Sequence, residues 1–276
     1  MKPPAEKEEN EEQVRERVSP PGEVVYEAIH REGEHELRRA NRELAWSGLA
    51  AGLSMGFSFV TESLLRSHLP EARWAPAVSK LGYCIGFLIV ILGRQQLFTK
   101  NTLTVILPLL NRRNGTRVGN VARLWAVVLS ANFAGAFLFA CLLAFTSTFD
   151  ADVRGGFDRI GADMPRIGFV SLALRGVLAG WLIALMIWLM PFAESGRVWV
   201  IVLLAYVVGL AHLPHIIAGA VPAFYVVLTG QRALGDCVIG YLLPTFLGNA
   251  IGGVALVAAL AHAELSEASN SQDRRR

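Results

Sequence analysis

Residues 212–219, HLPHIIAG, interrupt a long apolar run with a proline, a glycine and two histidines. Pro214 lacks a backbone donor and disfavours the α conformation at Leu213, so a helix passing through this stretch is expected to break. Irregular backbone at membrane depth persists only where protein or water satisfies its polar groups. His215, beside the break, is therefore predicted to line a pore, whereas His212 is expected to bond neighbouring helices.

The composition of the chain is typical of a multi-pass helical membrane protein. Hydrophobic residues make up 53% of the 276 residues, charged residues 18%, and the mean hydropathy is +0.41. A net charge of +3, with no interleaving of basic and aromatic residues, argues against nucleic-acid binding. Cys84, Cys141 and Cys237 lie inside apolar runs without the spacing of a disulfide framework or a metal site, so no metal and no other cofactor is expected.

Six apolar regions are long enough to cross a bilayer, which takes roughly 20 mostly apolar residues. They cover residues 44–66, 77–111, 121–147, 168–193, 197–228 and 234–262. Polar residues interrupt the second region at 93–96 and 99–101, and the fifth is interrupted at 212–219. The sequence thus predicts an all-α membrane protein with six transmembrane helices, of which the second and fifth are broken.

Three parts of different character follow one another along the chain. Residues 1–43 form a charged N-terminal extension, residues 44–263 the six-span domain, and residues 264–276 a polar C-terminal tail. The extension shows no cleavable signal peptide, and we expect it to be disordered to about residue 20 and helical over 23–43. That helix would lie on the membrane surface or on a neighbouring subunit, or would simply be solvated.

The distribution of basic residues between the short loops predicts the orientation in the membrane. With the N-terminus inside, the cytoplasmic side receives Arg38, Arg39, Arg42, Arg112, Arg113, Arg117, Arg123, Arg197 and Arg274 to Arg276. The other side receives Arg66, Arg73, Arg154, Arg159, Arg166 and Arg232, and its loop over 148–167 also carries several aspartates. Both termini are therefore predicted to be cytoplasmic.

The two halves of the six-span domain resemble each other. In each half the middle span is broken, and Asn132-x-x-Gly135 in the third span matches Asn249-x-x-Gly252 in the sixth. Because a repeat of three spans reverses its direction across the membrane, the repeat is inverted, and its paired broken spans point to a central permeation site. Small residues expected to let helices pack closely are Gly48, Gly52, Gly56, Gly248, Gly252 and Gly253.

Motifs in five of the six spans resemble those of the formate/nitrite transporter family. They are LFTKNTLT at 97–104, NFAG at 132–135, LRGVLAGWL at 174–182, HIIAG at 215–219 and PTFLGNAIGG at 244–253. The family patterns are Leu-Phe-Thr-Ser-Ser-x-x-Thr, Asn-Phe-x-Gly, Arg-Gly-Ile-Leu-x-Asn-Trp-Leu, His-Ser-x-Ala-Asn and Pro-x-x-x-Gly-Asn-x-x-Gly-Gly. The resemblance extends over residues 44–262.

The resemblance implies an aquaporin-like protomer with an inverted 3+3 repeat and one pore, assembled as a homopentamer in a bacterial inner membrane. It implies passage of small monovalent anions such as formate or nitrite, and no enzymatic activity. In this pattern His215 is the central pore histidine. The other pore residues expected from the resemblance are Leu97, Phe98, Thr99 and Lys100 beside the cytoplasmic constriction, Phe57 and Phe59 as apolar gates, and Asn132 and Asn249.

Three positions around the histidine depart from the family pattern. Gly219 replaces the asparagine that follows it, Gly180 replaces the asparagine of the fourth span, and Gln96 replaces the glutamate before Leu-Phe-Thr. Losing both asparagines removes polar partners that would orient the imidazole of His215. Gly219 and Gly180 are therefore expected to shape the pore of this chain.

The resemblance suggests how a small anion could cross a dry constriction, where a bare charge is costly. The N-terminus of a helix starting at Ile216 would attract the anion, and His215 would lend it a proton or a strong hydrogen bond. Thr99, Lys100 and Arg94 would shape the cytoplasmic entrance. Thr99 and Lys100 would also serve to satisfy freed backbone groups or to reach the membrane surface.

Other interpretations stay open at this point. With both asparagines replaced by glycine, the pore would suit a neutral or cationic solute, and the long N-terminal extension would suit a non-conducting sensor. An enzyme is the least supported class, because the sequence shows no nucleophile–base pair, no phosphate loop and no set of metal ligands beyond His212 and His215. Arg175, within the fourth span, is expected to be buried against backbone carbonyls or to lie at the external rim.

Overall fold

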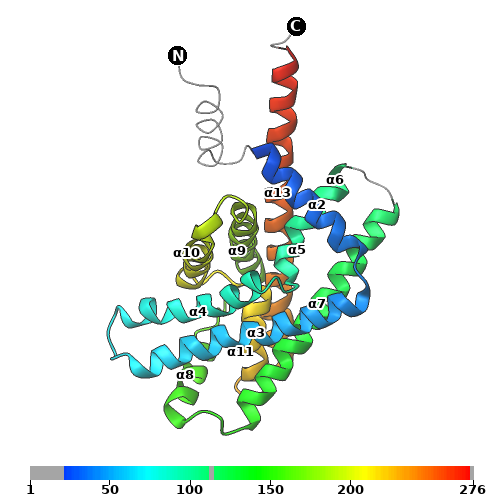
Figure 1. Ribbon diagram of the computed structural model, residues 1–276. Coiled ribbons are helices and arrows are strands. Elements are labelled where there is room, and N and C mark those ends of the chain that lie inside the picture. The colour runs from blue at the N-terminus through cyan, green and yellow to red at the C-terminus, as the bar shows by residue number, and fades with distance from the viewer. Residues whose placement is uncertain (1–21, 112–114, 274–276) are drawn as a thin grey trace, which may run out of the picture.

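The computed structural model describes residues 22–111 and 115–273, and within these ranges the chain forms helices and turns without a strand (Figure 1). The disorder expected for residues 1–20 lies outside the described residues. Five stretches are long and apolar enough to cross a membrane: α3 (Asn41–His68), α4 (Ala75–Leu92), α7 (Gly115–Phe145), α9 (Phe169–Leu189) and residues Leu234–Val257. The last comprises α12 (Leu234–Cys237), a π-helical turn (Val238–Leu242) and the start of α13 (Leu243–Asp273).

Two apolar segments are shorter, and each follows the end of another helix. α4 is followed by α5 (Phe98–Thr104) and α6 (Ile106–Asn111), and α10 (Arg197–Leu210) is followed by α11 (Ile216–Leu228). The helix ends fall where the sequence shows its polar interruptions. We call the connection from α4 to α5 the first joint and the connection from α10 to α11 the second joint.

The two joints have the same backbone geometry. Arg94 and His212 each lie two residues past a helix end, and both adopt a left-handed conformation with φ of 50°. Leu97 and His215 each precede the next helix, and both are extended, with φ, ψ of −108°, 129° and −110°, 128°. The two joints therefore share one backbone conformation, in which His215 has the place in the second joint that Leu97 has in the first.

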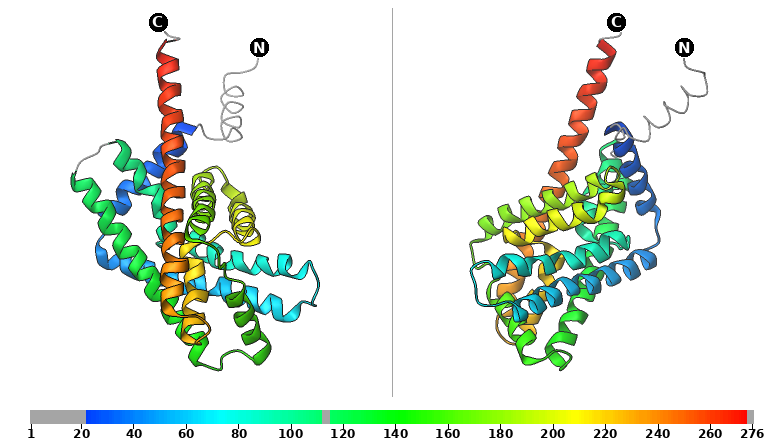
Figure 2. Two further views of the ribbon diagram at one scale, coloured as in Figure 1. Left: turned by 180° about the vertical axis from the view of Figure 1, so that it is seen from behind. Right: turned by 60° about the vertical axis from the view of Figure 1, so that its left-hand side comes forward.

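The halves also pack alike. α3 lies along α7 and α9 along α13, while α4 packs on α3 and α10 packs on α4 and α9. The right-hand view of Figure 2 shows α9 and α10 stacked above α4 and α3. A side chain at Gly52 would overlap the Asn132 carbonyl on α7, and one at Gly252 would overlap the Val177 carbonyl on α9. These contacts confirm that the small residues let the helices approach closely.

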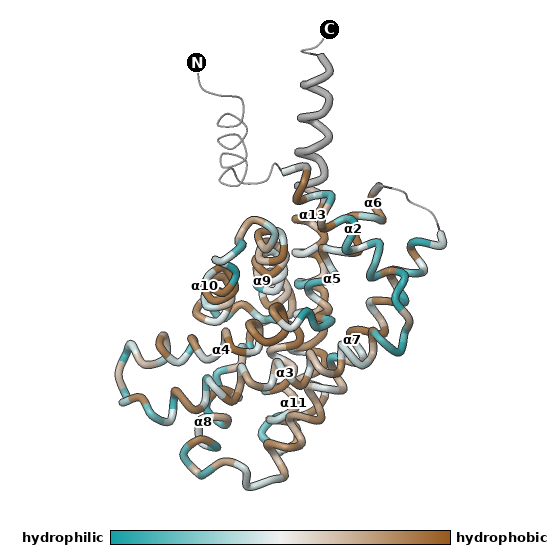
Figure 3. The backbone as a smooth tube through the Cα atoms, viewed as in Figure 1, coloured by the Kyte–Doolittle hydropathy of each residue, from teal (hydrophilic) through white to brown (hydrophobic). Residues whose placement is uncertain are grey.

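The polar helix of the N-terminal extension, α2 (Gly22–Arg38), packs on its own chain. It contacts α5, α6 and α7 and buries Val25, Ile29 and Leu37. Figure 3 shows that hydrophilic residues are frequent in α2, whereas α9, α10 and α11 contain hydrophobic stretches. α2 therefore covers one end of its own bundle and is not a freely solvated helix, whereas its placement on the membrane surface or on a neighbouring subunit stays a prediction.

The segment 148–167, expected to be a loop, contains α8 (Ala151–Ala162). The Asp150 carboxylate accepts a hydrogen bond from the Val153 N–H at 3.0 Å and caps this helix. Val153, Phe157 and Ile160 are buried where α8 packs on α3 and α11. Because these apolar residues recur at helical spacing among aspartates and arginines, their amphipathic pattern could have predicted the helix.

The outer surface of the bundle carries large apolar side chains, as expected of a protein in lipid. Trp46, Leu174 and Trp199 are 64%, 62% and 68% exposed. Arg175 is also exposed, which corrects the expectation that it is buried among backbone carbonyls. Its guanidinium lies on the outside of α9, one turn and a half from the start of that helix at Phe169.

Candidate permeation site

His215 lies at the second joint and is 1% exposed. Its Nδ1 accepts a hydrogen bond from the Ala218 N–H at 3.1 Å, which caps the first turn of α11. Its Nε2 lies 2.8 Å from the Thr99 hydroxyl on α5. The Phe87 ring of α4 packs edge-on against the imidazole at a centroid distance of 5.0 Å. The histidine thus connects the two short segments, α5 and α11.

These contacts indicate which ring nitrogen carries the proton. Because Nδ1 accepts from a backbone N–H, the neutral ring carries its proton on Nε2 and donates it to Thr99 Oγ1. The Thr99 hydroxyl hydrogen is then free to point toward another acceptor. In a doubly protonated ring, the Nδ1–H would face the Ala218 N–H, and both groups are donors. The observed hydrogen bonds therefore stabilise the neutral imidazole.

Asn249 holds the second joint together. Its Oδ1 accepts from the Ile216 N–H at 2.8 Å, and its Nδ2 donates to the Gly176 and Pro214 carbonyls, both at 2.9 Å. The side chain is fully buried, so its amide replaces backbone partners that the break removes. The Ile216 N–H at the start of α11, expected to attract an anion, is therefore already satisfied by protein.

Asn132 does the same at the first joint. Its Oδ1 accepts from the Phe98 N–H at 2.9 Å, and its Nδ2 donates to the Gly48 and Gln96 carbonyls at 2.7 and 2.8 Å. Both asparagines were expected to line the pore, and the structure corrects this. They are clamps on the backbone, and the matching Asn-x-x-Gly motifs reflect matching hydrogen bonds.

A cavity of about 90 Å³, which we call the vestibule, reaches His215 from one side. Its polar lining residues are Ser58, Glu62, Lys80, Tyr83, Asp163, His212, His215 and Tyr241. Phe59 also lines it, packing against Phe157 and Tyr225 at centroid distances of 5.0 and 5.6 Å. His215 is therefore one of the residues that line this cavity, although its own surface is almost entirely covered.

A second opening lies toward the other end of α4. The vestibule contacts α4 at Lys80 and Tyr83, whereas this opening, about 600 Å³ in volume, contacts the last turn at Val90 to Leu92. We call it the α2 cleft because α2 forms one of its walls. Its charged lining residues are Glu32, Glu36, Arg39, Arg94, Lys100 and Arg197. His215 lines the vestibule, Lys100 lines the cleft, and Thr99, the residue before Lys100, contacts His215.

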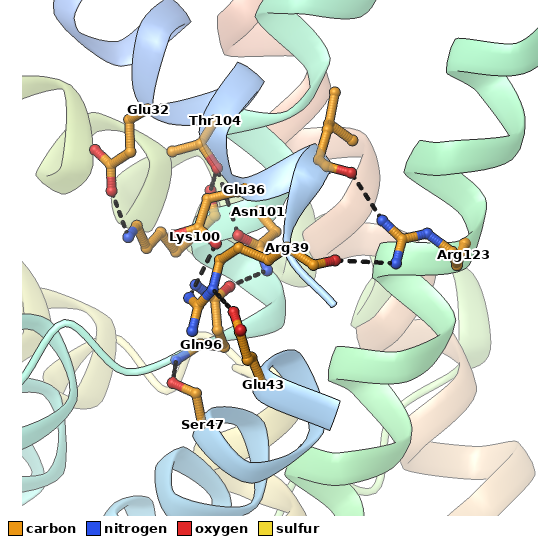
Figure 4. A network of polar contacts seen from close by, with 11 residues as sticks. Glu32, Glu36, Arg39, Glu43, Ser47, Gln96, Lys100, Asn101, Thr104 and Arg123 are labelled. Atoms are coloured by element: carbon orange, nitrogen blue, oxygen red, sulfur yellow. Dashed lines mark hydrogen bonds and ion pairs between the residues drawn. The ribbon is translucent and has the colours of Figure 1, made fainter. Parts of the chain in front are cut away.

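Salt bridges and hydrogen bonds fasten α2 over the first joint (Figure 4). The Lys100 ammonium on α5 pairs with the Glu32 carboxylate on α2 at 2.6 Å, while the Arg39–Glu36 pair at 3.1 Å is local to the end of α2. The Arg123 guanidinium on α7 donates to the Leu37 and Arg39 carbonyls at the end of α2, at 2.8 and 3.3 Å. Lys100 thus binds a neighbouring helix and does not reach for the membrane surface.

The aromatic and apolar residues expected at the constriction lie in three different places. Leu97 and Phe98 are fully buried, and Phe98 packs between Trp125 and Phe246 at 5.4 Å from each ring, so it anchors α5 in the core. Phe57 is 47% exposed and packs on Phe139 at the outer surface. Of the two phenylalanines expected as gates, only Phe59 borders the vestibule.

The two glycines that depart from the family pattern have different surroundings. A side chain at Gly180 would overlap the Asn249 carbonyl, so this position is a close contact between α9 and α13, and the expected pore role is corrected. A side chain at Gly219 would overlap the Tyr241 hydroxyl. Gly219 does line the vestibule, and Tyr241 fills the space beside it.

The chain is similar in sequence to a known family of membrane proteins. The profile of the family described as formate/nitrite transporter matches residues 23–263. The chain belongs to the formate/nitrite transporter family. Inner membrane protein YfdC of Escherichia coli (strain K12) is 36% identical over 242 residues, which cover 88% of this chain and 78% of that protein. Formate channel BtFdhC of Bacillus thuringiensis is 23% identical over 219 residues, which cover 76% and 82%.

Two solved structures of formate/nitrite transporters share the fold. A structure described as a pentameric formate channel with formate bound superposes with a TM-score of 0.70 at 19% identity, covering 82% of this chain and 98% of that one. A structure described as an FNT family ion channel gives 0.75 at 17% identity, covering 87% and 98%. The matched family is one of transporters and BtFdhC is named a formate channel, so the chain is a membrane transport protein.

Sequence reasoning missed several polar residues that this formate/nitrite transporter places in its vestibule, Glu62, Lys80 and Tyr241 among them. Glu62 and Lys80 form an ion pair at 2.6 Å, and Tyr241 is 5% exposed beside Gly219. A signal for the pair was present: a carboxylate inside the first expected span and an ammonium near the start of the second are costly unless they are partnered. No comparable signal distinguishes Tyr241 from the tyrosines at other positions.

Proposed function

We propose that this protein is a channel for small monovalent weak acids of the formate and nitrite type, with one pore in each protomer. The solute would pass between the vestibule and the α2 cleft, and the contact of Thr99 with His215 would be the gate between them. The observation that carries this proposal is the 2.8 Å hydrogen bond between these two side chains, located where a cavity ends.

The hydrogen bonds of the ring favour donation over a full proton transfer. The His215 Nε2–H donates to Thr99, and the Thr99 hydroxyl can donate in turn to a carboxylate or nitrite oxygen entering from the α2 cleft. Partial transfer of positive charge along this chain lowers the cost of carrying an anion past apolar walls. Complete protonation of the ring would first require the Ala218 cap to open.

The proposal includes a placement in the membrane. α4 with α5 and α6, and α10 with α11, would each make one broken crossing, which together with α3, α7, α9 and α13 gives six. α2 and the far end of α13 lie at the same end of the bundle (Figure 1), which supports two termini on one side, the cytoplasm. The names of the relatives support a bacterial inner membrane and a homopentamer.

Uptake of labelled formate and nitrite into proteoliposomes tests the function. His215→Ala and Thr99→Val should each reduce flux about tenfold, since the loss of one buried hydrogen bond is worth about one decade. His68→Ala, at an exposed histidine, is the matched control and should leave flux unchanged. Flux of the wild-type level in His215→Ala would remove the proposed gate, and native mass spectrometry of the purified protein checks the pentamer.

A further inference from the structure

An ion pair is built into the wall of the vestibule. Glu62 lies six residues before the end of α3 at His68, and Lys80 lies five residues after the start of α4 at Ala75. The Lys80 Nζ and Glu62 Oε1 atoms are 2.6 Å apart. The Glu62 side chain is 3% exposed and that of Lys80 12%, so the two charges have little water around them.

The other charges at the vestibule are balanced as well. Among the described residues, the charged side chains that line it are Glu62, Lys80 and Asp163. Asp163 pairs with Arg66 at 2.7 Å, and the Asp163 side chain is half exposed. The remaining polar lining consists of tyrosine, serine and histidine side chains, and the hydrogen bonds of His215 stabilise its neutral form.

The α2 cleft differs in this respect. Arg39, Arg94, Lys100 and Arg197 outnumber the Glu32 and Glu36 carboxylates that line it. The Glu32 side chain is 44% exposed, so its pairing with Lys100 is shared with solvent. The α2 cleft therefore presents an excess of positive charge. The vestibule presents Lys80, whose charge is cancelled by the buried carboxylate of Glu62.

We propose that Glu62 sets the charge selectivity of the vestibule by holding Lys80 in this pair. With the pair intact, the vestibule admits small solutes that carry no net charge, the protonated form of a weak acid among them, and does not concentrate anions. Without Glu62, the ammonium of Lys80 faces a cavity of about 90 Å³ and makes it a site for a small anion. The proposal rests on the proposed function, because it names the charge state in which the solute enters.

The physical reason is the strength of Coulomb interactions away from bulk water. An unpaired ammonium in a poorly solvated cavity attracts an anion several times more strongly than it would in water. A carboxylate 2.6 Å from that ammonium cancels most of the field at the distance of a solute. Removing the carboxylate changes the local charge by one unit while the cavity keeps its shape, since glutamine is isosteric with glutamate.

Anion binding gives a test that does not depend on transport. The thermal midpoint of the detergent-solubilised protein is measured by tryptophan fluorescence at neutral pH, with sodium formate against sodium gluconate, whose anion is too large for the vestibule. Glu62→Gln should be stabilised by formate relative to gluconate, and wild type should not. The double variant Glu62→Gln/Lys80→Met should lose this difference, because it has no free ammonium.

Transport gives the second readout. In proteoliposomes at neutral pH, where formate is almost entirely the anion, Glu62→Gln should raise formate entry from the vestibule side about tenfold. The double variant should return to the wild-type rate. Glu27→Gln is the matched control, because it removes the carboxylate of another 2.6 Å ion pair that lies exposed on α2. That control should change neither the rate nor the thermal midpoint.

The outcomes separate this proposal from the proposed function. A folded Glu62→Gln variant with no formate-specific stabilisation overturns the role of Glu62, whatever the transport rates are. Stabilisation of Glu62→Gln in a protein that transports no weak acid supports the charge assignment and refutes the proposed function. If Glu62→Gln does not fold, Lys80→Met decides: its unpaired carboxylate should make methylammonium, but not tetrabutylammonium, stabilising, and equal effects of the two cations overturn the proposal.

Discussion

The asparagine clamps give the sharpest prediction about stability. Replacing Asn249 by alanine removes three hydrogen bonds to backbone groups, which involve Ile216, Gly176 and Pro214. Replacing Asn132 removes three more at the equivalent points of the first joint. Because the two sites match atom for atom, Asn249→Ala and Asn132→Ala should destabilise the protein by similar amounts.

The size of the effect lies between two limits. Hydrogen bonds between helices in membranes are worth about 0.6 kcal/mol each on average, so three of them give about 2 kcal/mol. That average is low because polar groups of the unfolded chain also find partners within the membrane. Here the asparagines are fully buried, and an unsatisfied buried backbone group costs about 1–3 kcal/mol. The structure can relax partly around the cavity that alanine leaves. We therefore expect the free energy of unfolding to fall by about 2–5 kcal/mol in each variant.

Unfolding in mixed micelles of dodecyl sulfate and a mild detergent measures this loss for a helical membrane protein. Thr146→Ala is the control, because its hydroxyl bonds the Leu142 carbonyl at an exposed helix end, and it should cost less than about 0.5 kcal/mol. Should Asn249→Ala unfold within about 0.5 kcal/mol of wild type, the side chain does not hold the joint. A large difference between the two asparagine variants would contradict the equivalence of the joints.

Three further changes have defined outcomes. Gly52→Leu should prevent assembly of α3 on α7, because its side chain would overlap the Asn132 carbonyl, and the yield of folded protein checks this. Thr99→Ser keeps the hydroxyl that bonds His215 and should retain flux where Thr99→Val loses it, as labelled uptake would show. Burial raises the pKa of the Glu34 carboxyl, but its hydrogen bond to Arg117 and the nearby positive charges outweigh this, so the net pKa lies below 4.5. The contribution of Glu34 to the docking of α2 is therefore complete above about pH 4.5 and is lost as the pH falls below it, which hydrogen exchange of α2 measures.

The sequence was most informative about the backbone. Pro214 and the polar residues near Gln96 predicted interruptions where α4 and α10 end, because few side chains can satisfy such breaks inside an apolar region. The glycine spacing correctly predicted close helix packing. What the residues at a joint do was harder to infer, since a buried amide that binds backbone and one that lines a pore have the same sequence signature.

The sequence did not predict the direction in which individual side chains point, and the assignments that depended on that direction failed. Phe98 and Thr99 are adjacent, yet one ring enters the core and the other side chain meets His215, because successive helical positions face different ways. Phe57 and Phe59 separate in the same manner. Glu62 and Lys80 were passed over because they lie 18 positions apart, and only the packing of α3 on α4 brings them together.

The intimate contacts between α3 and α7 and between α9 and α13 have a consequence for motion. In each pair, carbonyl oxygens of one helix lie against glycines of the other. The helices therefore cannot slide past one another by a turn without severe overlap. Each pair of helices therefore moves as a rigid unit, and sliding of one helix along the other is suppressed. Any opening of the proposed pore would therefore come from rotamer changes and small tilts of α5 and α11, and not from sliding within these helix pairs.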